Sequence, residues 1–548
     1  MSGPLEKHEQ HHHHVFGQDA QEEVALEALG YQQELKRSFG LISMIGFSFS
    51  IVTSWSALSG VLIIGAESGG PPVMIWSWIG ICAASLAVAY SMAEMCSAYP
   101  VAGGQYSWVA MLAPKKVARG LSYICGWFML IGLLAMGATN NFIVANFILG
   151  VSNLNHPSYV IQRWQTVLVA YGVGLASLAF NILGPKLLEK VSRGLLIWNV
   201  CAFFIIVITI LSMNDHKQSA AFVFRDFVNE TGFSRSYTAI IGLLQAAFGM
   251  CCYDAPAHMV EEIHNPRKEA PRAIILSVYL GFITGFVFLI AACFCMAGIE
   301  ETALSSTGVP IIEIFYNSTA SRAGASCLTV LLIVIGMGGS NALTVTGGRA
   351  VFAFARDRGL PFSPIWAKVE KKSQIPVMAI CLTVAVQMAL NSIYFGTVTG
   401  FNTVVSIATL GFYVSYAMPL LTRLASLLFA GSRGPAATIQ GGLYTLGRWS
   451  VPMNSIGLLY LLFTSITFNF PTISPVDSEN MNYTSAAVGA IMLISLVTWI
   501  TTGKRQFAGP EIVHPAVIIE GREPHHDALD EDLIHEGRSI AVSTKGQQ

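Results

Sequence analysis

The feature that most constrains this chain is a series of long apolar runs that continues along almost its whole length. A helix needs about 20 mostly apolar residues to cross about 30 Å of bilayer hydrocarbon. Twelve runs meet this requirement, which is the pattern of a polytopic membrane protein. We expect membrane-spanning helices at residues 39–64, 72–97, 120–151, 160–183, 187–213, 237–263, 272–298, 324–350, 376–396, 401–422, 450–470 and 484–502.

Composition agrees with a protein that lies mainly in a bilayer. Of the 548 residues, 53% are hydrophobic and only 11% are charged, which is outside the range of ordinary soluble domains. The formal net charge is −1, and no basic patch alternates with aromatic residues, so nucleic acid is not expected as a partner. The sequence patterns of serine hydrolases, zinc proteases and phosphate-binding loops are absent. We therefore expect neither an enzyme nor an ATP-driven pump, and we expect no cofactor.

The distribution of basic residues predicts which way the spans run. If the N-terminus is cytoplasmic, the inner loops carry 18 of the 31 Lys and Arg residues, the outer loops carry 5 and the tails carry 8. Cytoplasmic loops of membrane proteins are enriched in Lys and Arg. We therefore expect both the N-terminus and the C-terminus in the cytoplasm.

Three glycosylation triplets give an independent indication of orientation. The pattern Asn-x-Ser/Thr occurs at Asn229, Asn317 and Asn482, and each lies in a predicted outer loop. Any one of them could be an unused chance triplet, but all three fall on the same predicted face. The pattern favours a glycoprotein made on a eukaryotic secretory route.

The two ends of the chain differ from the apolar core. Residues 1–38 are polar, with a histidine cluster at 11–14, and residues 503–548 are charged and polar. Such segments bury too little apolar surface to fold alone, so we expect disordered cytoplasmic tails on either side of a core at 39–502. The histidines could bind metal, but a low-complexity segment or an expression tag explains them better, and no metal site is predicted.

Two spans that lie five apart are interrupted in the same way. The first contains the polar stretch Ser48–Ser56, and the sixth contains Phe248–Pro256 with Gly, Asp and Pro together. In lipid, backbone freed by such residues is tolerated only inside protein or along a cavity. Corresponding interruptions in two halves predict a binding site at the bilayer midplane, between inverted repeats. Close helix packing through small residues is the alternative.

Three segments resemble one transporter superfamily. Ala93–Tyr106 (AEMCSAYPVAGGQY), the sixth-span segment Tyr253–Ile263 followed by Asn265-Pro266-Arg267, and Ala353–Pro361 (AFARDRGLP) are similar to signatures of the amino acid–polyamine–organocation (APC) superfamily. The similarity is closest to its fungal amino acid and choline branch. The resemblance covers residues 38–502 and implies an all-α LeuT-type fold, with two inverted repeats of five spans and two accessory helices.

The interrupted spans supply the candidate substrate contacts. Asp254 is an acidic residue deep in a predicted span, which is a functional hypothesis by default: it could pair with an amine, accept a coupling proton or serve structure. Free N–H groups around Thr53 would suit a carboxylate. Trp55 and Phe248 could cover the ligand, and Asn341 could face the same cavity or bond to another helix. The full predicted set is Thr53, Ser54, Trp55, Ser56, Phe248, Gly249, Met250, Cys251, Asp254 and Asn341.

A second group of charged residues is predicted to gate the inner side. His258, Glu261 and Glu262 follow Asp254 at helical spacing, and we expect them to form a charge network with Arg267 and Lys268. Zinc is not expected, because three or four converging ligands are missing. The resemblance places Asp254 itself at an inner gate, below the substrate. Glu94 is counted among the gating residues and is expected to serve structure at the same face.

The resemblance also bears on coupling. Proton-coupled relatives often have a lysine in the fifth span, where this chain has Trp198 or Asn199. Proton coupling is still what the fungal branch implies, with exchange or facilitated movement as alternatives. We expect an integral multi-pass transporter of the plasma membrane, or of the vacuolar membrane, that contacts lipid and moves an amino acid, 4-aminobutyrate, choline or a polyamine together with H⁺. The competing hypothesis is an amino acid sensor with the same fold.

Overall fold

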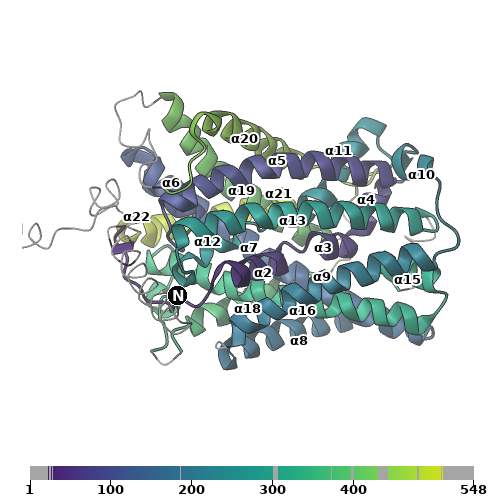
Figure 1. The fold of residues 1–548 in the computed structure, drawn as a ribbon. Helices are drawn as coiled ribbons and strands as arrows, with labels where there is room; N and C mark the ends of the chain where they lie inside the picture. Colours follow the sequence, from purple (N-terminus) through teal and green to yellow (C-terminus); the bar gives the residue numbers. More distant parts are fainter. Residues whose placement is uncertain are drawn as a thin grey trace, which may run out of the picture.

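The computed structural model is an all-helical bundle (Figure 1). It describes residues 23, 26–27, 29–184, 187–299, 307–371, 373–396, 400–429, 442–477, 481–507 and 509. Its α-helices are α2 (Leu41–Ile51), α3 (Ser54–Gly60), α4 (Leu62–Glu67), α5 (Gly70–Ala98), α6 (Gln105–Leu112), α7 (Lys115–Asn155), α8 (Arg163–Leu183), α9 (Leu188–Met213), α10 (Ala220–Phe224), α11 (Arg235–Gly249), α12 (Ala255–His258), α13 (Pro266–Cys295), α15 (Pro310–Thr319), α16 (Arg322–Arg356), α17 (Ser363–Trp366), α18 (Val377–Asn391), α19 (Gly400–Phe429), α20 (Ser450–Thr467), α21 (Thr484–Thr498) and α22 (Lys504–Gln506).

Shorter elements complete the chain. Four are tight or wide helical turns: η2 (Val260–Glu262), η3 (Ser392–Phe395), η5 (Gly447–Trp449) and η6 (Trp499–Gly503). Two-residue strands β1 (Ser68–Gly69) and β2 (Val228–Asn229) pair antiparallel. The predicted all-α membrane fold is therefore confirmed, since this pairing and one isolated bridge between Phe39 and Ile263 are the sheet-like contacts of the described chain.

Within the described residues, eleven helices are long and apolar enough to cross a membrane. They are Leu41–Gly60, Gly70–Ala98, Lys115–Asn155, Arg163–Leu183, Leu188–Met213, Pro266–Cys295, Arg322–Arg356, Val377–Phe395, Thr403–Leu428, Gly447–Thr467 and Thr484–Gln506. Each overlaps one predicted span. The remaining predicted span, 237–263, is not a continuous helix: α11 has 15 residues, and α12 and η2 follow it after a break. The count of twelve crossings stays a prediction.

Several helices are longer than the predicted spans, among them α7 and α16. The helix α7 has 41 residues and α16 has 35, so at 1.5 Å per residue α7 is about 60 Å long. The extra turns of α7 begin at Lys115 and Lys116, which are exposed. Charged residues at a helix end reach the aqueous interface, so an apolar run underestimates the length of the helix that contains it.

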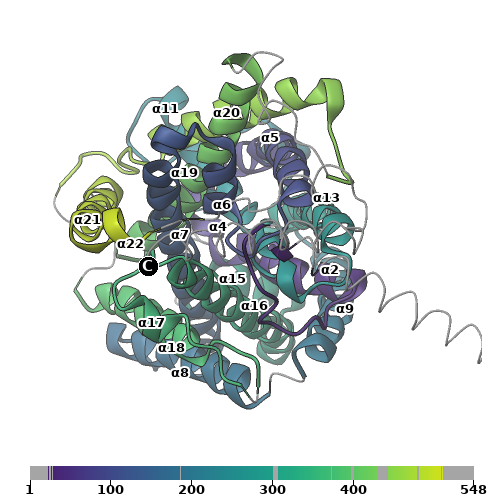
Figure 2. The same cartoon turned by 90° about the vertical axis from the view of Figure 1, so that its left-hand side faces the viewer.

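The most buried spans form the centre of the bundle. About 83% of the apolar window of α19, 78% of that of α7 and 72% of that of α16 is buried, compared with 11% for the last span. Figure 2 shows α21 at the rim of the bundle. The spans α5, α7 and α8 pack against α13, α16 and α18, their counterparts five spans later, which supports the predicted inverted repeat.

Both described ends of the chain lie on one face, which we call the N-terminal face. Tyr31 bonds to Asp357 there, and Arg119 donates to the carbonyl oxygen of Phe507 at 2.7 Å. This face is on the left in Figure 1, with α6, α12 and α22, whereas α10 and α15 lie at the opposite face. Ends on the same face require an even number of crossings.

The last part of the predicted N-terminal tail packs against the helical bundle. Leu29 and Leu35 are 2% and 3% exposed, because this segment packs against the ends of the spans at the N-terminal face. The backbone N–H groups of Ser38 and Phe39 donate to the carbonyl oxygen of Glu262 at 2.9 and 3.0 Å. The histidine cluster at 11–14 and the predicted tail beyond residue 509 lie outside the described residues.

Candidate functional site

The first span is broken where its sequence is polar. The helix α2 ends at Ile51 and α3 begins at Ser54. The Thr53 hydroxyl donates to the carbonyl oxygens of Phe49 and Ser50 at 2.6 and 2.9 Å, and the Ser54 hydroxyl donates to Val52 at 2.9 Å. These hydroxyls satisfy the C-terminal end of α2. The first-turn N–H groups of α3 at 54–56 have no hydrogen bond within the described chain, as expected for the start of a helix.

The sixth span is broken after Gly249. The Met250 N–H closes the last turn of α11, and Cys252 then adopts φ 65°, a left-handed conformation that is strained for a residue with a side chain. Among the described residues no N–H donates to the carbonyl oxygens of Phe248 and Gly249. This break therefore presents hydrogen-bond acceptors, whereas the first-span break presents donors.

The two breaks lie next to each other against α13. A Cβ placed on Gly281 of α13 would lie 2.6 Å from Ser54 Oγ and 3.3 Å from Met250 Cε. Only a residue without a side chain allows this approach. The structure thus brings together the two interruptions predicted from sequence.

Trp55 is held in place by the fifth span. Its Nε1–H donates to Asn199 Oδ1 at 2.8 Å, and its ring packs 5.7 Å from the rings of Phe203 and Phe288. Asn199 Nδ2 also reaches Thr53 Oγ1 at 3.4 Å. Of the two positions considered from sequence, Asn199, and not the 39% exposed Trp198, therefore touches the break.

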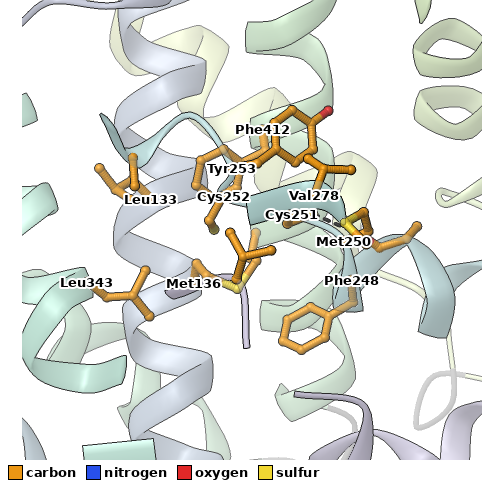
Figure 3. Packing of buried hydrophobic residues seen from close by; sticks show 14 of the residues in the cluster. Leu133, Met136, Phe248, Met250, Cys251, Cys252, Tyr253, Val278, Leu343 and Phe412 are labelled. Atoms are coloured by element: carbon orange, nitrogen blue, oxygen red, sulfur yellow. Dashed lines mark hydrogen bonds between the residues drawn. The ribbon is translucent and has the colours of Figure 1, made fainter. Parts of the chain in front are cut away.

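Apolar side chains pack around the sixth-span break. Figure 3 shows Leu133 and Met136 of α7, Leu343 of α16 and Phe412 of α19 around the Cys251–Tyr253 segment. Phe248, Met250 and Cys251 are at most 4% exposed. Asn341 is directed elsewhere: its Oδ1 accepts from Asn181 Nδ2 on α8 at 2.8 Å, so of its two predicted roles the structure favours the interhelical hydrogen bond.

Asp254 lies at the centre of a buried network. Its Oδ1 accepts from the Tyr416 hydroxyl at 2.6 Å, and its Oδ2 accepts from Gln105 Nε2 at 2.5 Å. His258 Nε2 lies 3.0 Å from the same Oδ2. Asp254 and His258 are each 1% exposed. The carboxylate therefore ties the sixth span to α6 and α19.

The predicted partners of Glu261 and Glu262 were wrong. The helix α12 ends at His258, and the tight turn η2 directs both carboxylates toward α16 instead of toward Arg267 and Lys268. Arg356 donates to both oxygens of Glu261 at 3.2 and 2.9 Å, and Arg349 Nε donates to Glu262 at 2.7 Å. No group of three or more metal-ligating side chains occurs in the described part of the chain.

The N-terminal segment covers this cluster. The Tyr31 hydroxyl reaches both carboxylate oxygens of Asp357, at 3.0 and 2.9 Å, and the Tyr106 hydroxyl donates to one at 2.8 Å. The Arg356 guanidinium lies 4.2 Å from the Tyr31 ring centroid. Burial raises the pKa of Asp357 to about 6, against the lowering effect of Arg356 and of both hydroxyls. The segment thereby joins the end of α16 to α6.

Glu94 is part of a separate contact. Its oxygens accept from the Leu446 N–H and the Ser450 hydroxyl, each at 2.9 Å, and lie 3.7 Å from Arg423. These partners join α5 to α19 and to the start of α20. None of these three partners belongs to η2, and the contact supports the predicted structural role.

The three predicted glycosylation sites lie at the face opposite to the N-terminal face. Asn229 is in β2 and pairs with Ser68. Asn317 is near the end of α15, and Asn482 lines a surface hollow together with Glu230 and Thr231, the two residues that follow Asn229. Asn229 and Asn317 are exposed, whereas Asn482 is half-buried.

Several residues of these networks were not predicted from the sequence. Gln105 and Tyr416 lie 149 and 162 residues from Asp254. Gln105 belongs to the signature-like segment Ala93–Tyr106, but nothing in the local sequence of either residue indicates a contact with Asp254. Arg349 could have been found, because it is a charged residue within a predicted apolar span. Such a residue is expected to have a partner inside the bundle.

Comparisons with known proteins agree with this architecture. Residues 39–496 match the amino acid permease family. The chain is 66% identical over 444 residues to a Macrophomina phaseolina protein provisionally named amino acid/polyamine transporter, covering 81% of this chain and 97% of that protein. It is 31% identical over 475 residues to a choline transporter of Saccharomyces cerevisiae, covering 86% of this chain and 83% of that transporter. It is also 30% identical over 493 residues to amino-acid permease 2 of Neurospora crassa, covering 89% of this chain and 88% of that permease. The chain therefore belongs to the amino acid permease family of the APC superfamily, whose members are membrane transporters and not enzymes.

Proposed function

We propose that this protein is a secondary transporter that binds a small amino acid or amine between the breaks of the first and sixth spans. The observation that carries the proposal is the pairing of opposite backbone groups at these neighbouring breaks. Free N–H groups at 54–56 suit a carboxylate, and free carbonyl groups at Phe248 and Gly249 suit an ammonium group. Thr53, Trp55, Ser56, Met250 and Cys251 complete the proposed site.

The candidate solutes are amino acids, 4-aminobutyrate, choline and polyamines. The names of the relatives include amino acids, polyamines and choline, which supports this range. In the proposed cycle the first and sixth spans move together around the site, and the contacts of Asp254, His258, Glu261 and Glu262 at the N-terminal face open and close. We further propose that transport is coupled to H⁺.

The proposal is tested by uptake of labelled amino acids, 4-aminobutyrate, choline and polyamines in cells that lack their own permeases. We expect Trp55→Phe to lower uptake at least tenfold, equivalent to about 1.4 kcal/mol, because it removes the bond to Asn199 while keeping an aromatic ring. The matched control is Trp164→Phe, since Trp164 is 54% exposed on α8. Surface expression is measured for both variants.

Each outcome decides the question. Uptake by wild type and by Trp164→Phe but not by Trp55→Phe supports the proposed site. Equal uptake by all three proteins places the substrate elsewhere. If surface-expressed wild type takes up no solute but supports a nutrient signal, the sensor hypothesis replaces transport.

We propose a plasma-membrane location, with the vacuolar membrane as the alternative, and a cytoplasmic N-terminal face. Substituting Gln for Asn229, Asn317 or Asn482 is then expected to raise the electrophoretic mobility of the protein, and glycosidase treatment of wild type is expected to give the mobility of the triple variant. Asn155→Gln is the control, because Asn155 lies at the end of α7 on the same face but outside any triplet. A wild-type protein insensitive to glycosidase, with an N-terminal tag accessible from outside the cell, would contradict this orientation.

A further inference from the structure

Both ring nitrogens of His258 face oxygen atoms. Nδ1 lies 3.3 Å from the carbonyl oxygen of Ala102, and Nε2 lies 3.0 Å from Asp254 Oδ2. A carbonyl oxygen can only accept a hydrogen bond, so the contact with Ala102 needs a proton on Nδ1. A neutral imidazole has one N–H, which this contact already uses.

The second contact therefore needs another proton. Tyr416 and Gln105 already donate to the Asp254 carboxylate, and the contact with His258 needs a proton between Nε2 and Oδ2. Whether this proton belongs formally to the imidazolium or to the carboxylic acid, the pair holds one proton more than a neutral histidine beside an ionised aspartate. Its net charge is then zero.

The surroundings of the pair make this proton necessary. The elements α2, α13, α16 and η2 pack against α12, and α6 and α19 contribute the uncharged donors Gln105 and Tyr416. The buried faces of α2 and α13 are uncharged, while Arg349 and Arg356 of α16 pair with Glu262 and Glu261 of η2. The other titratable groups near Asp254 are Tyr416, Tyr253, Cys251 and Cys252. Loss of the proton would leave a buried carboxylate without a compensating charge, which is strongly unfavourable.

We propose that the His258–Asp254 pair is the binding site of one proton that is transported with the solute. This inference rests on the proposed transport function. Asp254 follows the strained Cys252 in the sixth-span break, whereas Ala102 lies between α5 and α6, and Gln105 begins α6, at the N-terminal face. Movement of α12 away from that segment breaks the Ala102 and Gln105 contacts and admits water. The proton is then released at the N-terminal face, and by linkage solute and proton each strengthen the binding of the other.

The test uses purified protein in liposomes with a solute identified by the uptake panel, an inward gradient of one pH unit and the membrane potential clamped at zero. One pH unit corresponds to a tenfold ratio, so wild type is expected to accumulate the solute about tenfold. His258→Gln is expected only to equilibrate it, while still exchanging labelled for unlabelled solute. His264→Gln, which removes a histidine from the same face outside the pair, is expected to retain tenfold accumulation.

Tyr416→Phe provides a second measurement with minimal risk to folding. It removes one donor from the carboxylate, so the pair holds its proton more tightly and the pH profile of uptake shifts to more alkaline pH. An unchanged or acid-shifted profile overturns the proposal, as does tenfold accumulation by His258→Gln. Wild-type uptake that does not depend on the pH gradient also overturns the proposed proton site, but it is compatible with the transport function. Absence of any wild-type uptake contradicts the transport function itself.

Discussion

Replacing Arg349 with methionine is expected to unfold most of the protein in detergent at temperatures that wild type withstands. Arg349 Nε lies 2.7 Å from Glu262 Oε1, and the side chains of the pair are 4% and 8% exposed. Removing one partner of a buried ion pair costs about 3–5 kcal/mol, because the other charge stays buried without compensation. This is a large part of the typical net stability of about 5–15 kcal/mol.

The measurement is the temperature at which monodisperse protein is lost during size-exclusion chromatography after heating. Arg193→Met is the matched control: Arg193 pairs with Glu189 on α9, but its side chain is 58% exposed, and such surface pairs contribute about 0–1 kcal/mol. The double variant Glu262→Met/Arg349→Met is expected to recover part of the loss, since no charge is left unpaired. If Arg349→Met is as stable as Arg193→Met, the ion pair between Arg349 and Glu262 does not stabilise the protein.

The fold and the breaks could be predicted because they depend on local sequence. The length of an apolar run is set by the thickness of the bilayer, and the polar residues at 48–56 and 249–256 interrupt two such runs within a few residues. Each break then appears in the structure where the sequence places it, between Ile51 and Ser54 and after Gly249.

The partners of the charged residues could not be predicted in the same way. Helical spacing puts His258 and Glu261 or Glu262 on one face, but the helix ends at His258 and η2 turns the carboxylates toward Arg349 and Arg356. These arginines are 87 and 95 residues away. Which distant side chain completes a buried network depends on how the spans pack, and that information is spread over the whole chain.

Gly132→Ala is expected to destabilise the protein although it adds a single methyl group. A Cβ on Gly132 of α7 would lie 2.7 Å from the backbone nitrogen of Phe412 and 2.9 Å from the carbonyl carbon of Gly411, both on α19. Backbone atoms cannot rotate away as a side chain can. The two most buried spans must therefore move apart, and overpacking of this kind costs about 1–3 kcal/mol.

Gly120→Ala on the same helix is the matched control, because a Cβ there meets no atom within 4 Å. Alanine is the better helix former by up to about 1 kcal/mol, so the two substitutions are expected to shift the melting temperature in opposite directions. A Gly132→Ala protein that melts no lower than wild type would contradict the backbone contact between α7 and α19.

The same substitution is expected to reach the site through α19. Tyr416, which donates to Asp254 at 2.6 Å, lies five residues after Gly411 on that helix. A helix displaced by even a few tenths of an ångström lengthens a hydrogen bond that is already short, and hydrogen bonds weaken steeply with poorer geometry. Gly132→Ala is therefore expected to shift the pH profile of uptake in the same alkaline direction as Tyr416→Phe, whereas Gly120→Ala is expected to leave it in place. A loss of stability without any shift would show that α7 and α19 separate without moving Tyr416 from Asp254.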